Sequence, residues 1–142
     1  MRQVKAIIEG KEVLLNLTQE QETQVFGDGM DEIYTFHKTT REEFDKKYEG
    51  IPDNLKALQQ EFMIVAYYNK GERLVLEDED VYKYYPWFEF DENGGQVFNG
   101  VLDWLACTTV PAPSLFIRES DCEEAVKKFD HIYQRSRGYC KE

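Results

Sequence analysis

The chain is 142 residues long, is 42% hydrophobic, and carries 17 Lys and Arg against 28 Asp and Glu, for a net charge of −11. This apolar content excludes global disorder, and the length suits one domain with a core of its own. The acidic balance disfavours non-specific binding to nucleic acid and to anionic membranes. Because the sequence shows neither a charged-then-apolar leader nor an apolar run of about 18 residues, we expect one cytoplasmic domain over residues 1–142 with no membrane partner.

The beginning of the chain, residues 1–27, predicts a β-hairpin followed by a short helix. Residues 4–17 alternate apolar with other side chains, as two short strands do. Gly10-Lys11 interrupts them and suits a two-residue turn with glycine at its first central position. Thr18 and Gln21 then form a capping-box pattern, which is typical of a helix start.

The next stretch, residues 28–38, is rich in Gly and Asp and predicts a loop with a brief extended piece at 33–36. Thr40 and Glu43 repeat the capping-box pattern. A second helix is therefore expected to begin there and to end near Gly50.

The strongest helix signal follows Pro52 and runs to Gly71. Its apolar residues recur at i, i+3, i+7 and i+10, which is the spacing of one helix face. They predict a stripe that faces a core: Leu55, Leu58, Phe62 and Val65. Residues 40–70 are therefore expected to form the helical part of the fold.

Six of the nine residues from Tyr82 to Phe90 are aromatic, and they predict a β-strand. With a period of two, one face of this strand is expected to pack on a core: Tyr82, Tyr84, Phe88 and Phe90. The other face is mixed: Lys83, Tyr85, Trp87 and Glu89. Because proline cannot donate to a β-ladder, Pro86 places the strand at a sheet edge or marks a bulge.

Two more strands and a helix are predicted after the aromatic strand. Asn93-Gly94-Gly95 suits a turn into a second strand over 96–108, and residues 114–118 predict a third. Ser120 and Glu123 form a third capping box. The helix that follows presents one apolar face: Cys122, Ala125, Val126, Phe129, Ile132 and Tyr133.

These elements predict an α+β fold. It comprises an N-terminal β-hairpin, two or three helices, and an antiparallel three-stranded meander covered by a C-terminal helix. Within the single domain, the expected parts are the hairpin and short helix at 1–27, the helical part at 40–70, and the meander with its helix at 74–135.

The segment from Tyr82 to Phe88, Tyr-Lys-Tyr-Tyr-Pro-Trp-Phe, is similar to one in a family of uncharacterised phage and prophage proteins of gut Bacteroidetes. A C-terminal pattern also resembles that family: Phe116, Ser120, Ala125, Phe129 and Tyr133. The opening at 8–21 resembles the start of small phage proteins. The resemblance covers roughly residues 40–133, and the chain departs from it at 72–80 and 114–118. It implies a phage context, in the host cytosol or in the virion, and no particular chemistry.

The sequence carries no catalytic or metal-binding pattern. His37 and His131 lack a second His or a Cys at ligand spacing, and the three cysteines form no C-x-x-C pair. Those cysteines are Cys107, Cys122 and Cys140. The phosphate-binding loop, the Rossmann fingerprint and the nucleophile elbow are absent. We therefore predict that the protein is not an enzyme and takes no cofactor or metal.

The mixed face of the aromatic strand is the candidate binding surface: Tyr85, Trp87, Lys83 and Glu89. Such rings anchor protein interfaces, stack on bases in single-strand-binding sheets, or are buried beneath helices. A single-strand groove needs several cations, whereas Lys83 is the only one near these rings and six acids surround it. Charge therefore favours a protein partner over nucleic acid.

Those six acids form a second candidate surface: Glu77, Asp78, Glu79, Asp80, Asp91 and Glu92. On one contiguous face they would act as a decoy for a nucleic-acid-binding host protein; dispersed in turns they would only be solvated. The sequence favours a non-enzymatic, phage-type accessory protein that acts by protein–protein interaction. Single-stranded nucleic-acid binding and the acidic decoy are the alternatives, and homo-oligomerisation is left open.

Overall fold

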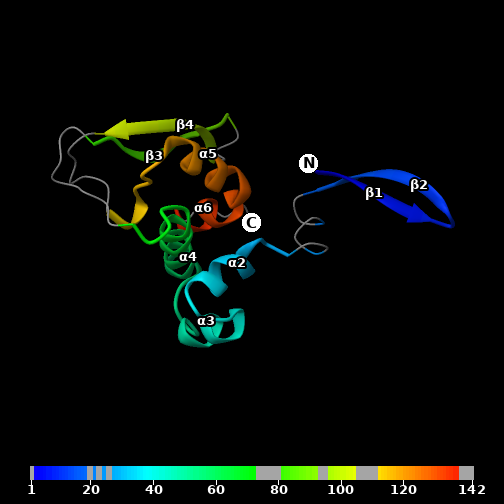
Figure 1. Ribbon diagram of the computed structural model, residues 1–142, viewed down its shortest axis with the longest axis horizontal. Coiled ribbons are helices and arrows are strands. Elements are labelled where there is room, and N and C mark those ends of the chain that lie inside the picture. Colours follow the sequence, from blue (N-terminus) through cyan, green and yellow to red (C-terminus); the bar gives the residue numbers. More distant parts are fainter. Residues whose placement is uncertain are drawn as a thin grey trace.

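The computed structural model describes residues 2–18, 21, 24, 27–72, 81–92, 96–104 and 112–137, and these form an α+β fold, as predicted (Figure 1). Its elements, in chain order, are β1 (Arg2–Ile8), β2 (Lys11–Leu17), α2 (Met30–Phe36), α3 (Arg41–Lys47), α4 (Asp53–Tyr68), β3 (Lys83–Phe90), β4 (Gln96–Trp104), the 3-10 turn η1 (Ala112–Ser114), α5 (Glu119–Lys128) and α6 (Asp130–Ser136). None of the helices in these ranges has both the length and the apolar character needed to cross a membrane.

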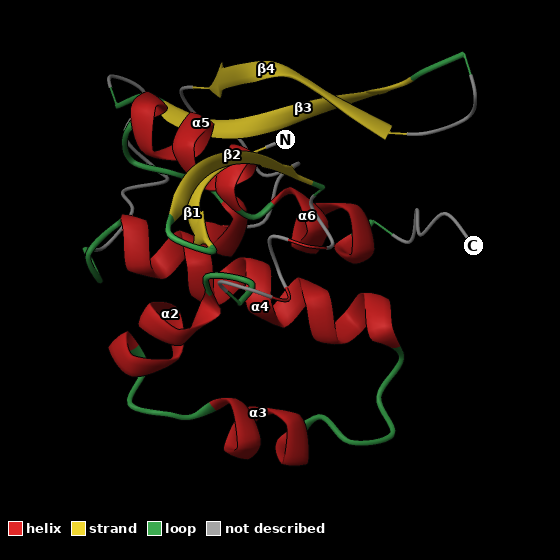
Figure 2. Cartoon of the chain, turned by 90° about the vertical axis from the view of Figure 1, so that its right-hand side faces the viewer, coloured by secondary structure: helices red, strands yellow, loops and turns green. Residues whose placement is uncertain are grey.

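The core surrounds α4: α5, α6 and the β3–β4 hairpin lie on one side of this helix, and α2 and α3 lie on the other. Helix α5 packs against both strands, and α6 packs along α4 (Figure 2). Helices α2 and α3 lie on the far side of α4 from the strands. The buried core cluster comprises Met30, Ile33, Tyr34, Phe44, Ala57, Ile64, Val65, Phe116, Cys122, Ala125, Val126, Phe129, Ile132 and Tyr133. Burying each large apolar side chain contributes roughly 1.5–3 kcal/mol.

Two of the predicted capping boxes are confirmed by their hydrogen bonds. The Oγ1 atom of Thr40 accepts from the backbone N–H of Glu43 at 3.2 Å, and Thr40 is the N-cap of α3, which begins at Arg41. Thr18 and Gln21 bond reciprocally, each side chain accepting from the other's backbone N–H, at 3.0 and 3.2 Å. Most of the short helix predicted after Thr18 lies outside the described residues.

The loop predicted for residues 28–38 is wrong, because α2 occupies Met30–Phe36. Gly29 is the N-cap of this helix, and Oδ1 of the preceding Asp28 accepts from the N–H of Met30 at 3.0 Å. Burial raises the pKa of Asp28, but the hydrogen bonds from Arg41 and Met30 outweigh it and hold the pKa below its usual value. Met30, Ile33 and Tyr34 are buried at helical spacing, so the contacts of this short apolar face override the Gly- and Asp-rich start.

Helix α4 is confirmed, but the apolar stripe predicted to face the core is wrong except for Val65. Leu55 is 48% exposed, and Leu58 and Phe62 are only half-buried. The buried face instead comprises Ala57, Gln60, Glu61, Ile64 and Val65. Two polar residues can lie on this face because neighbouring side chains form hydrogen bonds with them. Nε2 of Gln60 donates to the Tyr34 hydroxyl at 3.0 Å, and the Ser136 hydroxyl donates to Glu61 at 2.8 Å.

Strands β3 and β4 pair antiparallel as predicted, but the three-stranded meander is not confirmed. The expected third strand is reduced, among the described residues, to one bridge, in which Tyr84 and Phe116 exchange backbone hydrogen bonds of 2.9 and 2.7 Å. Asn69, at the end of α4, forms hydrogen bonds with the backbone on both sides of Phe116. Its Nδ2 donates to the Leu115 carbonyl at 3.0 Å, and its Oδ1 accepts from the Ile117 N–H at 2.9 Å. The segment is thus held between β3 and α4.

The apolar face predicted for the C-terminal helix is confirmed, since all six of its residues are fully buried. The single helix is wrong: α5 and α6 meet at Phe129, whose backbone is not helical (φ −111°, ψ 29°). The predicted cap is also wrong, because Arg118 occupies the N-cap position and Ser120 lies inside the first turn. The sequence pattern located the buried face but not the break.

Replacing Asn69 tests the link between the strands and α4. Asn69→Ala leaves the Leu115 carbonyl and the Ile117 N–H without their partner in a buried position, so we expect the free energy of unfolding to fall by about 1–3 kcal/mol. Urea unfolding followed by circular dichroism measures this. Asn54→Ala, at an exposed position in the first turn of the same helix, is the matched control and should change stability by less than about 0.5 kcal/mol. Equal effects of the two variants would contradict the link.

Candidate functional site

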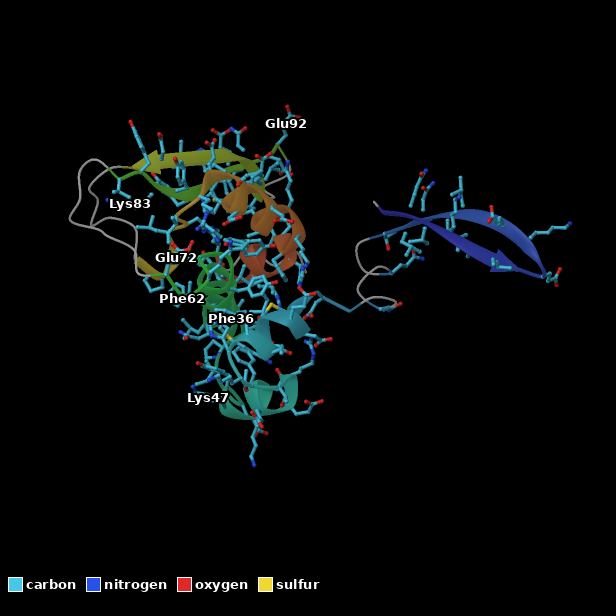
Figure 3. All side chains as sticks on the ribbon, in the orientation of Figure 1. Phe36, Lys47, Phe62, Glu72, Lys83 and Glu92 are labelled. Atoms are coloured by element: carbon cyan, nitrogen blue, oxygen red, sulfur yellow. The ribbon has the colours of Figure 1, made fainter. Side chains whose placement is uncertain are left out.

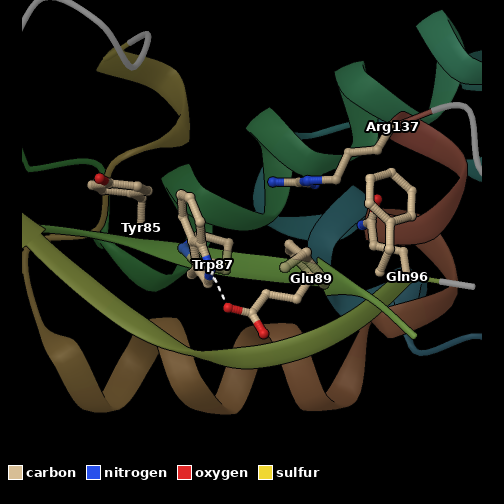
Figure 4. Close-up of a pocket in the computed structure, with 8 residues that line it drawn as sticks. Tyr85, Trp87, Glu89, Gln96 and Arg137 are labelled. Carbon is tan, nitrogen blue, oxygen red and sulfur yellow. Dashed lines mark hydrogen bonds between the residues drawn. The ribbon is translucent and has the colours of Figure 1, made fainter. Parts of the chain in front are cut away.

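An open groove of about 440 Å³ runs beside the second half of β3 (Figure 4). It is lined by Tyr85, Pro86, Trp87, Phe88, Glu89, Phe90, Gln96 and Arg137. Three of the four residues predicted for the binding surface line this groove: Tyr85, Trp87 and Glu89. The structure therefore places the aromatic face identified from the sequence at a concave surface.

Lys83, the fourth predicted residue, does not line the groove. It is 1% exposed and interacts within the protein. Strict alternation placed it beside Tyr85 and Trp87 on a mixed, partly solvated face, and that placement is wrong. Because its ammonium group is buried, Lys83 cannot supply a cation to a ligand in the groove.

A register irregularity in the β3–β4 pairing lies opposite Trp87. Pro86 pairs with Val101 and Phe88 pairs with Phe98, so Asn99 and Gly100 both lie opposite Trp87. Gly100 has a φ of 110°, a backbone angle that residues other than glycine rarely adopt. The prediction of an edge or bulge at Pro86 is confirmed. Trp87 is 45% exposed, so the alternative in which helices bury this ring does not hold.

The Trp87 ring is held in place by its neighbour on the same face. Its Nε1–H donates to Oε1 of Glu89 at 3.3 Å (Figure 4). This bond leaves the flat face of the indole available, and Glu89 itself is exposed. The groove therefore combines a half-exposed ring with a carboxylate at its rim.

Arg137, at the end of α6, forms the opposite wall (Figure 4). Its guanidinium carbon lies 4.4 Å from the centre of the Phe88 ring and 5.1 Å from that of Tyr133. Nη1 donates to the Tyr133 carbonyl at 3.3 Å and to Ser136 Oγ at 3.1 Å, and it pairs with Oε2 of Glu61 at 3.4 Å. Arg137 was not predicted as a site residue, because it follows the C-terminal helix in a stretch without any motif.

Glu61 is the buried acid that fixes this cation. It is 2% exposed, and its Oε2 accepts from Ser136 Oγ at 2.8 Å and from Arg137. Burial raises the pKa of Glu61 above its ordinary value of 4.5, although Arg137 and Ser136 oppose the shift. The carboxylate thus carries a desolvation cost that its two partners offset only in part.

The predicted core face of the aromatic strand is confirmed only in its middle. Tyr84 and Phe88 pack against the core cluster, and Phe88 stacks on Tyr133 with ring centres 6.1 Å apart. Tyr82 and Phe90 are exposed, Phe90 by 62%. Their placement in the core is wrong because they flank the part of the strand that reaches the helices.

The acidic candidate surface is only partly described. Asp91 is half-buried and interacts within the protein, and Glu92 is exposed. Figure 3 shows Glu92 and Lys83 at opposite ends of β3. The other four acids, Glu77, Asp78, Glu79 and Asp80, lie outside the described residues. Whether the six acids share a face therefore stays a prediction.

The two histidines and Cys122 do not line the groove. His37 bonds through Nε2 to the Met63 carbonyl at 2.9 Å, and burial lowers the pKa of His131. Burial raises the pKa of the Cys122 thiol to about 12, so it is protonated at neutral pH. Within the described ranges, no three His, Cys, Asp or Glu side chains are grouped to hold a metal ion. Cys107 and Cys140 lie outside these ranges.

Comparison with known proteins gives no assignment: no family model, no curated protein and no solved structure matches the chain.

The raised pKa of Glu61 predicts a pH dependence of stability. An acid with a higher pKa in the folded state binds its proton more tightly there, so its contribution to stability falls as pH rises from about 4.5 through the folded-state pKa. Glu61→Gln removes this titration. Urea unfolding between about pH 5 and pH 8 should show the variant gaining stability relative to the wild type, by at most about 1.4 kcal/mol per pH unit. A relative loss with rising pH would show that Arg137 dominates.

Proposed function

We propose that this protein is a non-enzymatic, phage-type accessory protein that acts by binding another protein through the groove beside β3. The observation that carries the proposal is the half-exposed Trp87 ring, held by Glu89 opposite a fixed Arg137. The phage context rests on the sequence resemblance, which is specific only in the Tyr82–Phe88 segment.

The composition of the groove supports a protein partner. Trp, Tyr and Arg are the residues that most often dominate the binding energy of protein interfaces. Here Tyr85, Trp87 and Arg137 line one concave surface, with the Phe88 ring beneath the guanidinium. Because Trp87 and Arg137 are already held by hydrogen bonds, binding costs little side-chain entropy. A partner that inserts an apolar or aromatic side chain between them fits this arrangement.

Single-stranded nucleic acid is the weaker alternative. Such a groove needs cations that follow the phosphates. The groove's lining residues include one cation, Arg137, which is already paired with Glu61, and one exposed acid, Glu89. Lys83 is buried and contributes no charge to the surface. The charges near the rings therefore oppose a polyanion.

The acidic decoy stays a second form of the binding hypothesis. It requires one contiguous face of carboxylates spaced like phosphates. Asp91 and Glu92 lie together at the end of β3, which supplies part of such a face. This hypothesis requires that Glu77 to Asp80 lie on the same face as Asp91 and Glu92.

Partner capture tests the proposal. Affinity purification from an expressing host should recover a protein partner with the wild type, and Trp87→Ala should weaken that binding by about 30-fold, as loss of a central ring does. Tyr82→Ala is the matched control, because Tyr82 is a similarly exposed aromatic residue that does not line the groove. Equal recovery by Trp87→Ala, or an equal loss with Tyr82→Ala, would contradict the proposal.

A fluorescence titration distinguishes the nucleic-acid alternative. We expect single-stranded oligonucleotides to leave the emission of Trp87 and Trp104 unchanged at about 50 mM salt, because the groove has too few free cations. Quenching that weakens as salt is added would favour nucleic acid as the ligand.

A further inference from the structure

Arg137 presents one edge of its guanidinium to the groove beside β3. Its three hydrogen bonds within the described ranges all use Nη1, which donates to the Tyr133 carbonyl, to Ser136 Oγ and to Glu61 Oε2. Nε and Nη2 make no hydrogen bond within those ranges, and neither atom is buried. The edge formed by Nε and Nη2, which we call the free edge, can therefore donate to a ligand.

The guanidinium is held in one orientation. It lies on the Phe88 ring, with its central carbon 4.4 Å from the ring centre, and 5.1 Å from that of Tyr133. Figure 4 shows it pointing across the groove toward Trp87. The Arg137 side chain is 29% exposed, so a ligand can reach it. Because the contacts of Nη1 already fix the side chain, a ligand at the free edge orders little that is mobile.

A carboxylate is the ligand group that this free edge fits. Nε–H and one N–H of Nη2 point the same way, and they form two parallel hydrogen bonds with the two oxygens of a carboxylate. A phosphate group accepts in the same geometry but carries close to two negative charges. Arg137 is already paired with Glu61, and the chain has a net charge of −11. The singly charged carboxylate is therefore the better match.

The two acids next to the groove leave the free edge open. Glu61 contacts Nη1, and it is 2% exposed. Glu89 directs Oε1 to the Trp87 indole at 3.3 Å, and Figure 4 shows its carboxylate turned away from the guanidinium. An anionic group is therefore favoured beside Arg137 and disfavoured beside Glu89.

The rest of the groove determines what accompanies the carboxylate. The half-exposed Trp87 ring supplies an apolar wall across from Arg137. The lining follows six consecutive residues of β3, 85–90, which span about 20 Å of extended strand. Because Arg137 lies over Phe88, in the second half of this stretch, a chain that ended at Arg137 would leave part of the groove empty. An acidic side chain within a continuous segment fits better than a C-terminal carboxylate.

We infer that the groove beside β3 recognises an Asp or Glu side chain in an extended segment of its protein partner, with an aromatic or apolar side chain two residues away. The carboxylate accepts from Nε and Nη2 of Arg137, and the apolar side chain packs on Trp87. The two-residue spacing follows because alternate side chains of an extended segment share a face. This inference rests on the proposed function and specifies the chemistry of the partner.

An NMR titration of the isotope-labelled full chain tests the inference. The probe is the acetylated and amidated peptide Gly-Phe-Gly-Glu-Gly, and its matched control carries Gln in place of Glu. We expect the Glu peptide to bind in the millimolar range, as a short flexible ligand does, and to shift the Nε1–H resonance of Trp87 and the Nε–H resonance of Arg137. The Gln peptide should bind at least about 10-fold more weakly, because it cannot form the charge-assisted bidentate pair.

Two variants locate the carboxylate. Arg137→Lys keeps the positive charge but removes the planar fork, so it should weaken the Glu peptide at least about 5-fold and leave the Gln peptide unchanged. Arg135→Lys is the matched control, since Arg135 pairs with Asp53 at 3.6 Å and does not line the groove. It should bind both peptides like the wild type. The amide spectrum of each variant checks that it is folded.

Equal binding of the Glu and Gln peptides overturns the inference but leaves protein binding at the groove in place, because Trp87 still responds. A Glu peptide that shifts neither resonance also overturns it, as does an equal loss with Arg135→Lys and Arg137→Lys. Tighter binding of Gly-Phe-Gly with a free C-terminal carboxylate would instead assign the site to a chain end and overturn the choice of a side chain. The proposed function fails separately, if Trp87→Ala leaves partner capture unchanged.

Discussion

The buried carboxylate of Glu61 is the constraint on which much of this structure depends. It lies on the core face of α4, where an unpaired charge would be strongly destabilising. Ser136 and Arg137, at the end of α6, supply its hydrogen bonds. The need to satisfy this one acid therefore fixes where α6 ends against α4. On the same helix Leu55 is exposed and Phe62 is half-buried, while Glu61 lies on the buried face.

The same constraint builds the candidate site. Once Arg137 is held by Glu61, its guanidinium lies over Phe88 and closes one side of the groove. Asn69 makes the corresponding link at the other end of β3, by holding the Phe116 segment that bridges to Tyr84. The strand is thus attached to the helices at two points. Between these points lies the register irregularity, opposite the half-exposed Trp87.

Local signals in the sequence predicted much of the fold, and tertiary contacts decided the rest. The two hairpins, α3, α4 and the buried face of α5 and α6 follow from periodicity and capping, which are properties of neighbouring residues. The first turn was misplaced by one residue: it is Glu9-Gly10, both with positive φ, and not Gly10-Lys11, since Lys11 pairs with Ile8. Helix α2 was missed because its helical start depends on Asp28, which Arg41 holds from the next helix. The face of α4 was wrong because apolar periodicity ignores buried polar residues. The third strand is reduced to the Tyr84–Phe116 bridge, and the backbone groups on either side of Phe116 bond to the distant Asn69 side chain, a contact that no local pattern indicates.

The candidate site divides in the same way. Tyr85, Trp87 and Glu89 were predictable, since aromatic residues on one face of an edge strand are a local pattern. Lys83 was misplaced and Arg137 missed, because burial and a distant acid determine their roles. The central claim is that the groove is a protein-binding surface, and amide hydrogen exchange with and without the captured partner tests it most directly. The account predicts slowed exchange at residues 85–90 and 134–137 in the complex; slowed exchange elsewhere, with these segments unchanged, would contradict it.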